Sequence, residues 1–247
     1  MCWSGEASAV LASAGLGTTA YAAYRREPPA VWVPLGYFAL MELLQAFTYS
    51  VIDQCDLPSN QVATLLGYLH ITFQPFFINM VSMHFIPQQV GSRIAPTVYV
   101  LCFAAAIIML LQLYPFAWAG HCDPSTPLCG TRLCSVHGNW HIAWEVPTNG
   151  MCNAASHWAH GFPSYVIAGI FLPILYGSWR MTLFHLMLGP WLAALTTDNI
   201  NEWPAIWCLL SIGLLATAVK TPIRRLLRVR KWWLWPSSWR AEIAASH

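Results

Sequence analysis

The chain has 247 residues, of which 57% are hydrophobic and only 9% carry a formal charge, and it contains 14 tryptophans. Its mean hydropathy of +0.48 is higher than soluble domains of this length usually reach, because their surfaces need charged side chains. The formal net charge is only +2, and the sequence has neither an RNA-binding motif nor a soluble basic domain. These values predict a membrane protein and argue against a nucleic-acid partner.

Apolar stretches recur along the chain, each close to the ~20 residues that a helix needs to cross a bilayer. They cover residues 6–24, 31–52, 62–86, 97–118, 155–179, 181–198 and 204–222. We therefore predict an all-α fold in which residues 1–222 form a bundle of seven transmembrane helices. No basic segment with a cleavage site precedes the first stretch, so we expect the chain to insert without losing a signal peptide.

Basic residues and cysteines fall at opposite ends of this predicted bundle. Short cytoplasmic loops collect Lys and Arg, which places the N-terminus outside and the C-terminus in the cytoplasm. The outer end then carries most of the cysteines, where an oxidising compartment permits disulfides. These cysteines are Cys2, Cys55, Cys122, Cys129, Cys134 and Cys152. We expect an integral, multi-pass protein of the bacterial inner (plasma) membrane.

The C-terminal tail, residues 223–247, is basic and rich in tryptophan. Together with the end of the last span it contains the run KTPIRRLLRVRKWWLWPSSWR. Arg and Lys mixed with Trp are typical of segments that lie on a membrane surface, so we expect the tail to contact anionic lipids of the inner leaflet. An ordinary positively charged flank of the last span accounts for most of the same pattern.

The predicted outer loop, residues 119–154, between the fourth and fifth spans, concentrates histidine and cysteine. If its second half is helical, the spacing of four between His137, His141 and Glu145 places the three side chains on one face. Disulfides within the loop would close it into a lid over the helix ends. The pairing stays open, with Cys122–Cys152 and Cys129–Cys134 as two examples.

Polar side chains inside the predicted spans are few, and each is a candidate for function because it is costly to bury in hydrocarbon. Glu42 lies near the middle of the second span, and His70 lies on the third. We expect Glu42 with His70 to exchange protons with a substrate. The structural alternative is a buried interhelical hydrogen bond.

Histidines near the predicted outer leaflet suggest a metal site. Imidazoles at spacings of three and four residues are how helices present ligands to zinc, iron or copper. The candidate ligands are His137, His141, His157 and His160, with Glu145 or Asp198 as a catalytic carboxylate. The alternative is that these histidines line a wet vestibule or form hydrogen bonds with the loop.

Our leading hypothesis from these residues is a membrane enzyme with a metal-centred or acid–base site near the outer leaflet. It would be a hydrolase or an oxidoreductase that acts on a lipid-like or small apolar substrate, with Zn, Fe or Cu as the cofactor. A second hypothesis is a transporter or sensor in which Glu42, His70, Gln74 and His84 form a path for protons or a small ligand. A third is a structural subunit of a larger membrane complex, with its oligomeric state left open.

The first third of the chain contains the segments MCWSGEAS, VWVPLGYFALMELLQAFTY and LHITFQPFFINM. These segments resemble uncharacterised multi-pass membrane families whose members begin Met-Cys-Phe/Trp-Ser-x-x-Ala-Ser. The resemblance implies a multi-pass membrane protein and carries no established activity.

Overall fold

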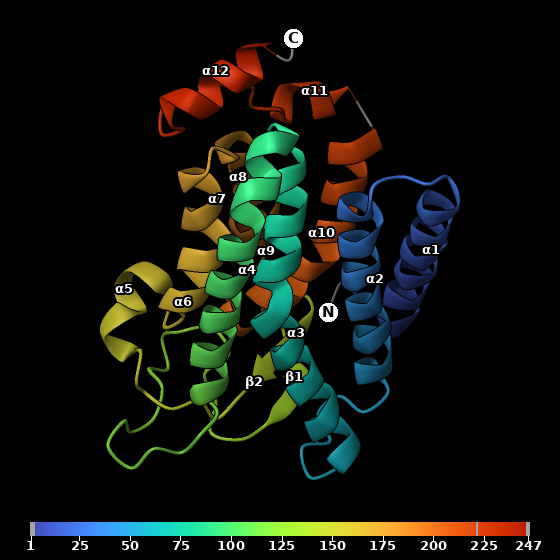
Figure 1. Ribbon diagram of the computed structural model, residues 1–247. Coiled ribbons are helices and arrows are strands. Elements are labelled where there is room, and N and C mark those ends of the chain that lie inside the picture. Colours follow the sequence, from blue (N-terminus) through green and yellow to red (C-terminus); the bar gives the residue numbers. More distant parts are fainter. Residues whose placement is uncertain (1–2, 221, 246–247) are drawn as a thin grey trace.

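The computed structural model describes residues 3–220 and 222–245, with the side chains of residues 214–220 not included. It is a bundle of helices with a small two-stranded sheet at one end (Figure 1). The first half contains α1 (Gly5–Tyr24), α2 (Pro29–Tyr49), α3 (Pro58–His84) and α4 (Gln88–Leu111). Successive helices run in opposite directions, because each connection between them is short (Figure 1).

The second half of the bundle is made of shorter helices joined end to end. One segment consists of a 3₁₀ turn η1 (Asn153–Ala155), α5 (Ser156–Ala159), α6 (Pro163–Val166), a π-helix η2 (Ile167–Phe171) and α7 (Leu172–Leu175). The next consists of α8 (Trp179–Leu186), a π-helix η3 (Met187–Trp191) and α9 (Leu192–Thr196). The 3₁₀ turn η4 (Ile200–Glu202), α10 (Trp203–Lys220), α11 (Ile223–Leu227) and α12 (Ser237–Ala245) complete the chain.

Each of the seven predicted apolar stretches coincides with one of these helical segments, so the helical fold class is confirmed for most of the chain. Within the described residues, three helical segments are both long and apolar enough to cross a membrane: Pro29–Tyr49, Gln88–Leu111 and Asn153–Leu175. These three segments indicate a membrane protein. The fourth helix lies further towards the N-terminus than the predicted 97–118, because it starts directly after Pro87 and ends at Leu111.

The loop after α4 departs from the all-α prediction. Residues 134–137 form β1 (Cys134–His137) and residues 142–145 form β2 (Ile142–Glu145), which pair as an antiparallel hairpin. The Gly138-Asn139 turn and the β-branched residues beside it favour this hairpin over a helix. The expectation that His137, His141 and Glu145 share a helix face is therefore wrong.

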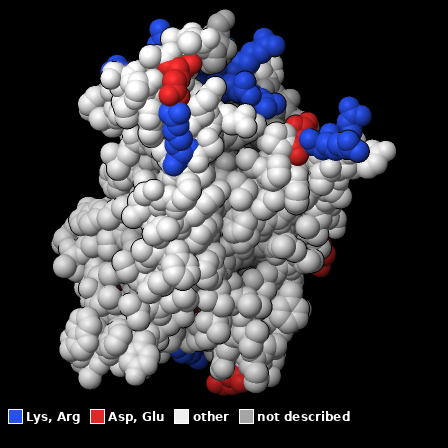
Figure 2. Space-filling model, viewed as in Figure 1, with Lys and Arg blue, Asp and Glu red and all other residues white. Residues whose placement is uncertain are grey.

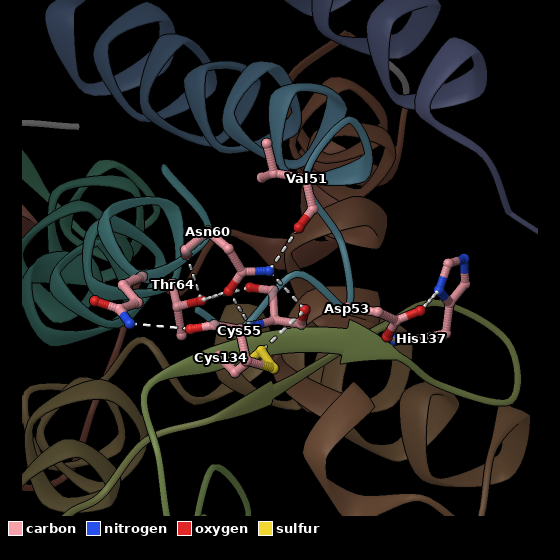
Figure 3. Close-up of a disulfide and its surroundings, with 9 residues drawn as sticks. Val51, Asp53, Cys55, Asn60, Thr64, Cys134 and His137 are labelled. Atoms are coloured by element: carbon pink, nitrogen blue, oxygen red, sulfur yellow. Dashed lines mark hydrogen bonds and ion pairs between the residues drawn. A yellow bond between two sulfur atoms is a disulfide. The ribbon is translucent and has the colours of Figure 1, made fainter. Parts of the chain in front are cut away.

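Two disulfides hold the loop, as expected, but with pairings other than the two examples named from the sequence. Cys122 bonds Cys129 within the loop, and Cys55 bonds Cys134, which ties the α2–α3 connection to the hairpin (Figure 3). Cys152 is a free thiol. Cys2 lies outside the described residues.

Asn60 supports the disulfide that reaches the hairpin. Its side-chain amide donates to the carbonyl oxygens of Val51 and Ser135 at 2.8 and 2.9 Å, and its Oδ1 accepts from the Ser135 N–H at 2.9 Å (Figure 3). Asn60 is fully buried. Because a buried amide must find partners for its donors and acceptor, these bonds fix the hairpin against the start of α3.

The main hydrophobic core lies directly behind the hairpin. Trp144 from β2 packs into it together with Met41 of α2 and Tyr68 of α3. A Cβ atom at Gly67 would lie 3.3 Å from the Trp144 indole, so the glycine permits this close approach of sheet and helix. The hairpin is thus part of the folded core and does not hang free from the bundle.

Charged residues divide the molecule into two different ends. Lys and Arg gather at the end that carries α11 and α12, and the middle of the visible face is almost uncharged (Figure 2). The hairpin and the disulfides lie at the opposite end (Figure 1). This is the division between basic residues and cysteines that the sequence predicts.

Candidate functional site

A pocket of about 410 Å³ lies between α3, the two segments that contain π-helices and the start of α10, under the disulfide-containing loop. We call it the loop-side pocket. Its residues from α3, α4 and the loop are Ile71, Gln74, Met109, Pro127 and Leu128. Those from the later helices are Ala159, His160, Phe162, Tyr165, Val166, Ile170, Leu186, Pro190, Trp191, Ala194, Trp203, Pro204 and Trp207.

Both π-helices border this pocket. Ile170 lies in the first π-helix, and Pro190 and Trp191 lie in the second. A proline has no N–H to donate to the carbonyl four residues earlier, so a helix that contains one widens or bends at that turn. Pro173 follows the first π-helix and Pro190 lies within the second. Single π-turns are frequent at functional sites, where they open space between helices.

The pocket wall is apolar except at a few points. The Tyr165 hydroxyl donates to Oε1 of Gln74 at 2.7 Å, and the Gln74 side-chain nitrogen lies 4.0 Å from the sulfur of Cys208. On the other side the Trp207 indole N–H donates to Nε2 of His185 at 2.8 Å. These bonds fix the polar groups of the wall while the indole rings supply flat apolar surface.

Gly189 makes room for one of these indoles. A Cβ atom at position 189 would lie 2.5 Å from the indole nitrogen of Trp207. No side chain tolerates such a contact without a shift. The position of Trp207 in the pocket wall therefore depends on a glycine in the second π-helix.

Glu42 is fully buried in α2, and neither of its carboxyl oxygens has a hydrogen-bonding partner that meets normal geometry. The side chains that interact with this carboxyl group are the Ser8 hydroxyl and, electrostatically, the Cys208 thiol. One helical turn away, Gln45 donates to the Ala205 carbonyl at 3.4 Å and leaves its own oxygen unpaired. Unpaired buried polar groups are costly, which makes Glu42 a candidate for function.

His70 does not pair with Glu42. Its ring stacks on Tyr37 with 3.9 Å between ring centroids, and the Tyr37 hydroxyl donates to the His70 carbonyl oxygen. The buried Nε2 of His70 has no hydrogen-bonding partner. His70 lines a separate apolar groove of about 780 Å³ between α2, α3 and α4, with Phe77 beside it.

The predicted metal ligands in the hairpin have other partners. Asp53 accepts from the His137 N–H at 2.8 Å and forms an ion pair with its ring (Figure 3). Burial acts to raise the pKa of Asp53, but the hydrogen bonds and charge of His137 outweigh it and lower the pKa below its usual value. His141 is fully buried, with Nδ1 2.7 Å from the Tyr49 hydroxyl.

The two other predicted ligands lie at the start of the fifth helical segment. The exposed ring of His157 interacts electrostatically with Asp123 of the loop. His160 contacts the edge of Trp203 with 5.7 Å between ring centroids, at the wall of the loop-side pocket. Across the described residues, no three His, Cys, Asp or Glu side chains form a group able to hold one metal ion. The structure thus does not bring the four histidines together as a ligand set.

The two other predicted catalytic carboxylates, Glu145 and Asp198, do not line the loop-side pocket. Glu145 pairs with Cys134 across the hairpin, and Asp198 is exposed. The carboxylate that instead organises this region is Glu202, which is fully buried and accepts three backbone N–H groups, those of residues 139–141. It holds the hairpin turn against the start of α10.

Most residues of the pocket wall are not among the site residues predicted from the sequence. Trp203 and Trp207 are four residues apart, a spacing that places both on one face of α10. That spacing is the only signal that could have indicated an aromatic wall. Tyr165 carries no pattern that separates it from other buried residues.

A family model matches residues 6–228, and its description is a family of unknown function, DUF5765. The chain belongs to the DUF5765 family. No curated protein and no solved structure matches it. The match to DUF5765 covers most of the chain and begins after the opening residues MCWSG. The part matched to DUF5765 includes the hairpin and the whole loop-side pocket and ends before α12.

Proposed function

We propose that the protein binds a lipid-like or small apolar molecule in the loop-side pocket and acts as a sensor or transporter of that ligand. The main observation in support of this proposal is the pocket of about 410 Å³ between the helices. Ligand sites typically have volumes of about 300–1,000 Å³, with mostly apolar walls and a few placed polar groups. This pocket has both properties.

The wall chemistry indicates the class of ligand. Trp191, Trp203 and Trp207 offer flat aromatic surface, while Gln74 with Tyr165 offers one fixed polar point on α3 and α6. No Lys, Arg, Asp or Glu lines the pocket among the described residues. A charged ligand would lose its hydration there without compensation, so the pocket favours a neutral apolar molecule with one hydrogen-bonding group.

The same proposal includes the membrane arrangement. Seven helical segments of alternating direction, an end rich in Lys and Arg and an opposite end with two disulfides support seven spans, with the N-terminus outside and the C-terminus in the cytoplasm. The loop-side pocket then opens near the outer leaflet of the bacterial plasma membrane. An alkaline phosphatase reporter fused within the loop should be active, and one fused to the C-terminus should be inactive. The reverse pattern would contradict this topology.

Filling the pocket tests the binding proposal. Ala194 lines the pocket, whereas the neighbouring Leu195 is 70% exposed on the outside of the bundle. We expect Ala194→Trp to remove apolar molecules that co-purify with the protein, as measured by mass spectrometry of an organic extract. The matched variant Leu195→Trp should retain them. Equal amounts in the two variants would contradict the proposal.

A second candidate function is an acid–base enzyme that acts on the same class of ligand, and the buried Glu42 favours it. Glu42 interacts with Cys208, whose sulfur neighbours Gln74 in the pocket wall. A buried carboxyl group that lacks a well-formed hydrogen bond is suited to proton transfer. Glu42→Gln should then keep the ligand bound and abolish its conversion. A metal-centred enzyme has less support, since the described residues include no group of three metal ligands.

A further inference from the structure

The C-terminal tail forms a groove of about 910 Å³ that is distinct from the loop-side pocket and lies at the opposite end of the molecule. We call it the tail groove. It is lined by Arg230, Lys231, Trp232, Trp233, Trp235, Ser237, Arg240, Ala241, Ile243 and Ala244. The matched family region ends at residue 228, so the groove is built from residues beyond it.

The tail is fixed to the end of the bundle. The indole N–H groups of Trp232 and Trp235 donate to the carbonyl oxygens of Leu175 and Tyr176 at 3.0 and 2.9 Å. The Val229 N–H donates to the carbonyl oxygen of Phe85, the residue directly after α3, at 2.9 Å. These bonds hold α11 and α12 across the helix ends, where Figure 1 shows them. The groove is therefore a shaped surface, and the basic residues around it have defined places.

Three exposed cations line the groove. Arg230, Lys231 and Arg240 are all exposed, and none of them forms an ion pair in the part of the chain that the structure describes. The acidic residue of α12, Glu242, instead binds Arg93 of α4 at 2.7 Å. Figure 2 shows that most of the charged residues at this end of the molecule are Lys and Arg. The unpaired cations create a positive potential that an anion would neutralise.

Aromatic residues place this potential at a membrane boundary. Trp233 is 71% exposed beside the cations, and Trp232 is half-buried in the same groove. Tryptophan is enriched at the level of lipid headgroups, because its ring is apolar and its N–H is polar. Cations and exposed indoles together match a ligand with a phosphate and acyl chains.

We propose that the tail groove binds the phosphate headgroup of an anionic phospholipid in the leaflet at this end of the bundle. Arg230, Lys231 and Arg240 contact the phosphate, and the exposed indole of Trp233 contacts the upper part of the acyl chains. Each cation near an anionic surface strengthens binding about fivefold. Removal of all three should weaken the retention of such a lipid by about 100-fold.

The test uses the full-length protein with phosphatidylglycerol as the probe and native mass spectrometry as the readout. The groove variant carries Arg230→Gln, Lys231→Gln and Arg240→Gln. The matched variant carries Arg25→Gln, Arg26→Gln and Arg225→Gln, which removes three exposed cations from the same end but outside the groove. We expect the matched variant to retain phosphatidylglycerol as the wild type does and the groove variant to lose it.

A charge-conserving variant and a competition with inorganic phosphate complete the test. A variant with Arg230→Lys and Arg240→Lys keeps the charge and should retain the lipid, so a loss of folding in the Gln variant would not hide the result. Equal retention in the groove variant and the wild type would overturn the proposal. Displacement of phosphatidylglycerol by millimolar inorganic phosphate would overturn the assignment to a lipid and favour a soluble phosphate ligand.

Discussion

At the scale of single residues, burial determines what the histidines of the hairpin can do. The His141 side chain is fully buried, and its ring lies parallel to that of Tyr49 with 5.8 Å between centroids. Burial lowers the pKa of His141 from 6.5 to about 3, because its surroundings disfavour the charged ring. His141 therefore packs as a neutral side chain that accepts or donates one hydrogen bond to a tyrosine.

Acid should destabilise the fold through this residue. Between the unfolded pKa of 6.5 and the folded pKa of about 3, the unfolded chain binds a proton at His141 that the folded chain does not. As the pH decreases through this range, the free energy of unfolding therefore decreases by up to about 1.4 kcal/mol per pH unit. Thermal unfolding in detergent from about pH 7 to about pH 4.5 measures this. The variant His141→Gln should show a shallower dependence, and identical slopes would contradict the assignment.

The sequence indicates which polar residues are candidates for function, but it does not indicate which groups they bind. Asp198 and Glu202 lie four residues apart, and only the fold buries Glu202 under the backbone N–H groups of the hairpin turn. Asp198 stays exposed. A carboxylate that binds backbone amides from a distant loop leaves no pattern in its own neighbourhood. The same holds for Asn60, which binds residues on both sides of the disulfide.

At the scale of elements, apolar runs were enough to predict where helices lie but not how they are distorted. The run 155–179 contains α5, α6, η2 and α7, with breaks at Gly161 and around Pro163. Hydropathy averages over a turn of helix and does not detect a change from α to π hydrogen bonding. The hairpin was missed because a spacing of four is compatible with a helix and also with two strands joined by a turn.

The second π-helix gives a prediction at this scale. Gly189→Ala should displace the Trp207 indole, break its bond to His185 and destabilise the protein by about 1–3 kcal/mol. Gly213→Ala is the control, because nothing lies within 4 Å of a Cβ there. In a helix that change stabilises by up to about 1 kcal/mol. Thermal unfolding compares the two, and a Gly189→Ala variant as stable as the control would contradict this packing.

At the scale of the whole molecule, composition predicted the membrane class and the division of charge and cysteine between the two ends. The pairing of the cysteines could not be predicted, since it depends on the hairpin. Cys55–Cys134 closes a loop with a separation of 79 residues, whereas Cys122–Cys129 closes one of 7. The longer link restricts the unfolded chain more.

This difference predicts unequal effects of removing the two disulfides. Loss of Cys55–Cys134 through Ser substitutions should cost about 4.5 kcal/mol, and loss of Cys122–Cys129 about 2.5 kcal/mol, from loop closure alone. Thermal unfolding of the two double variants in the same detergent gives the comparison. A larger effect from the shorter link would show that loop closure does not dominate.

Fluorescence quenching measures directly whether the loop-side pocket holds an apolar ligand. Three tryptophans line the pocket, so a brominated long-chain alcohol that enters it should quench their emission in a saturable way. Ala194→Trp fills the pocket and should remove the saturable component, while Leu195→Trp on the outer surface should leave it unchanged. Quenching that never saturates, or that is identical in the two variants, would contradict the claim.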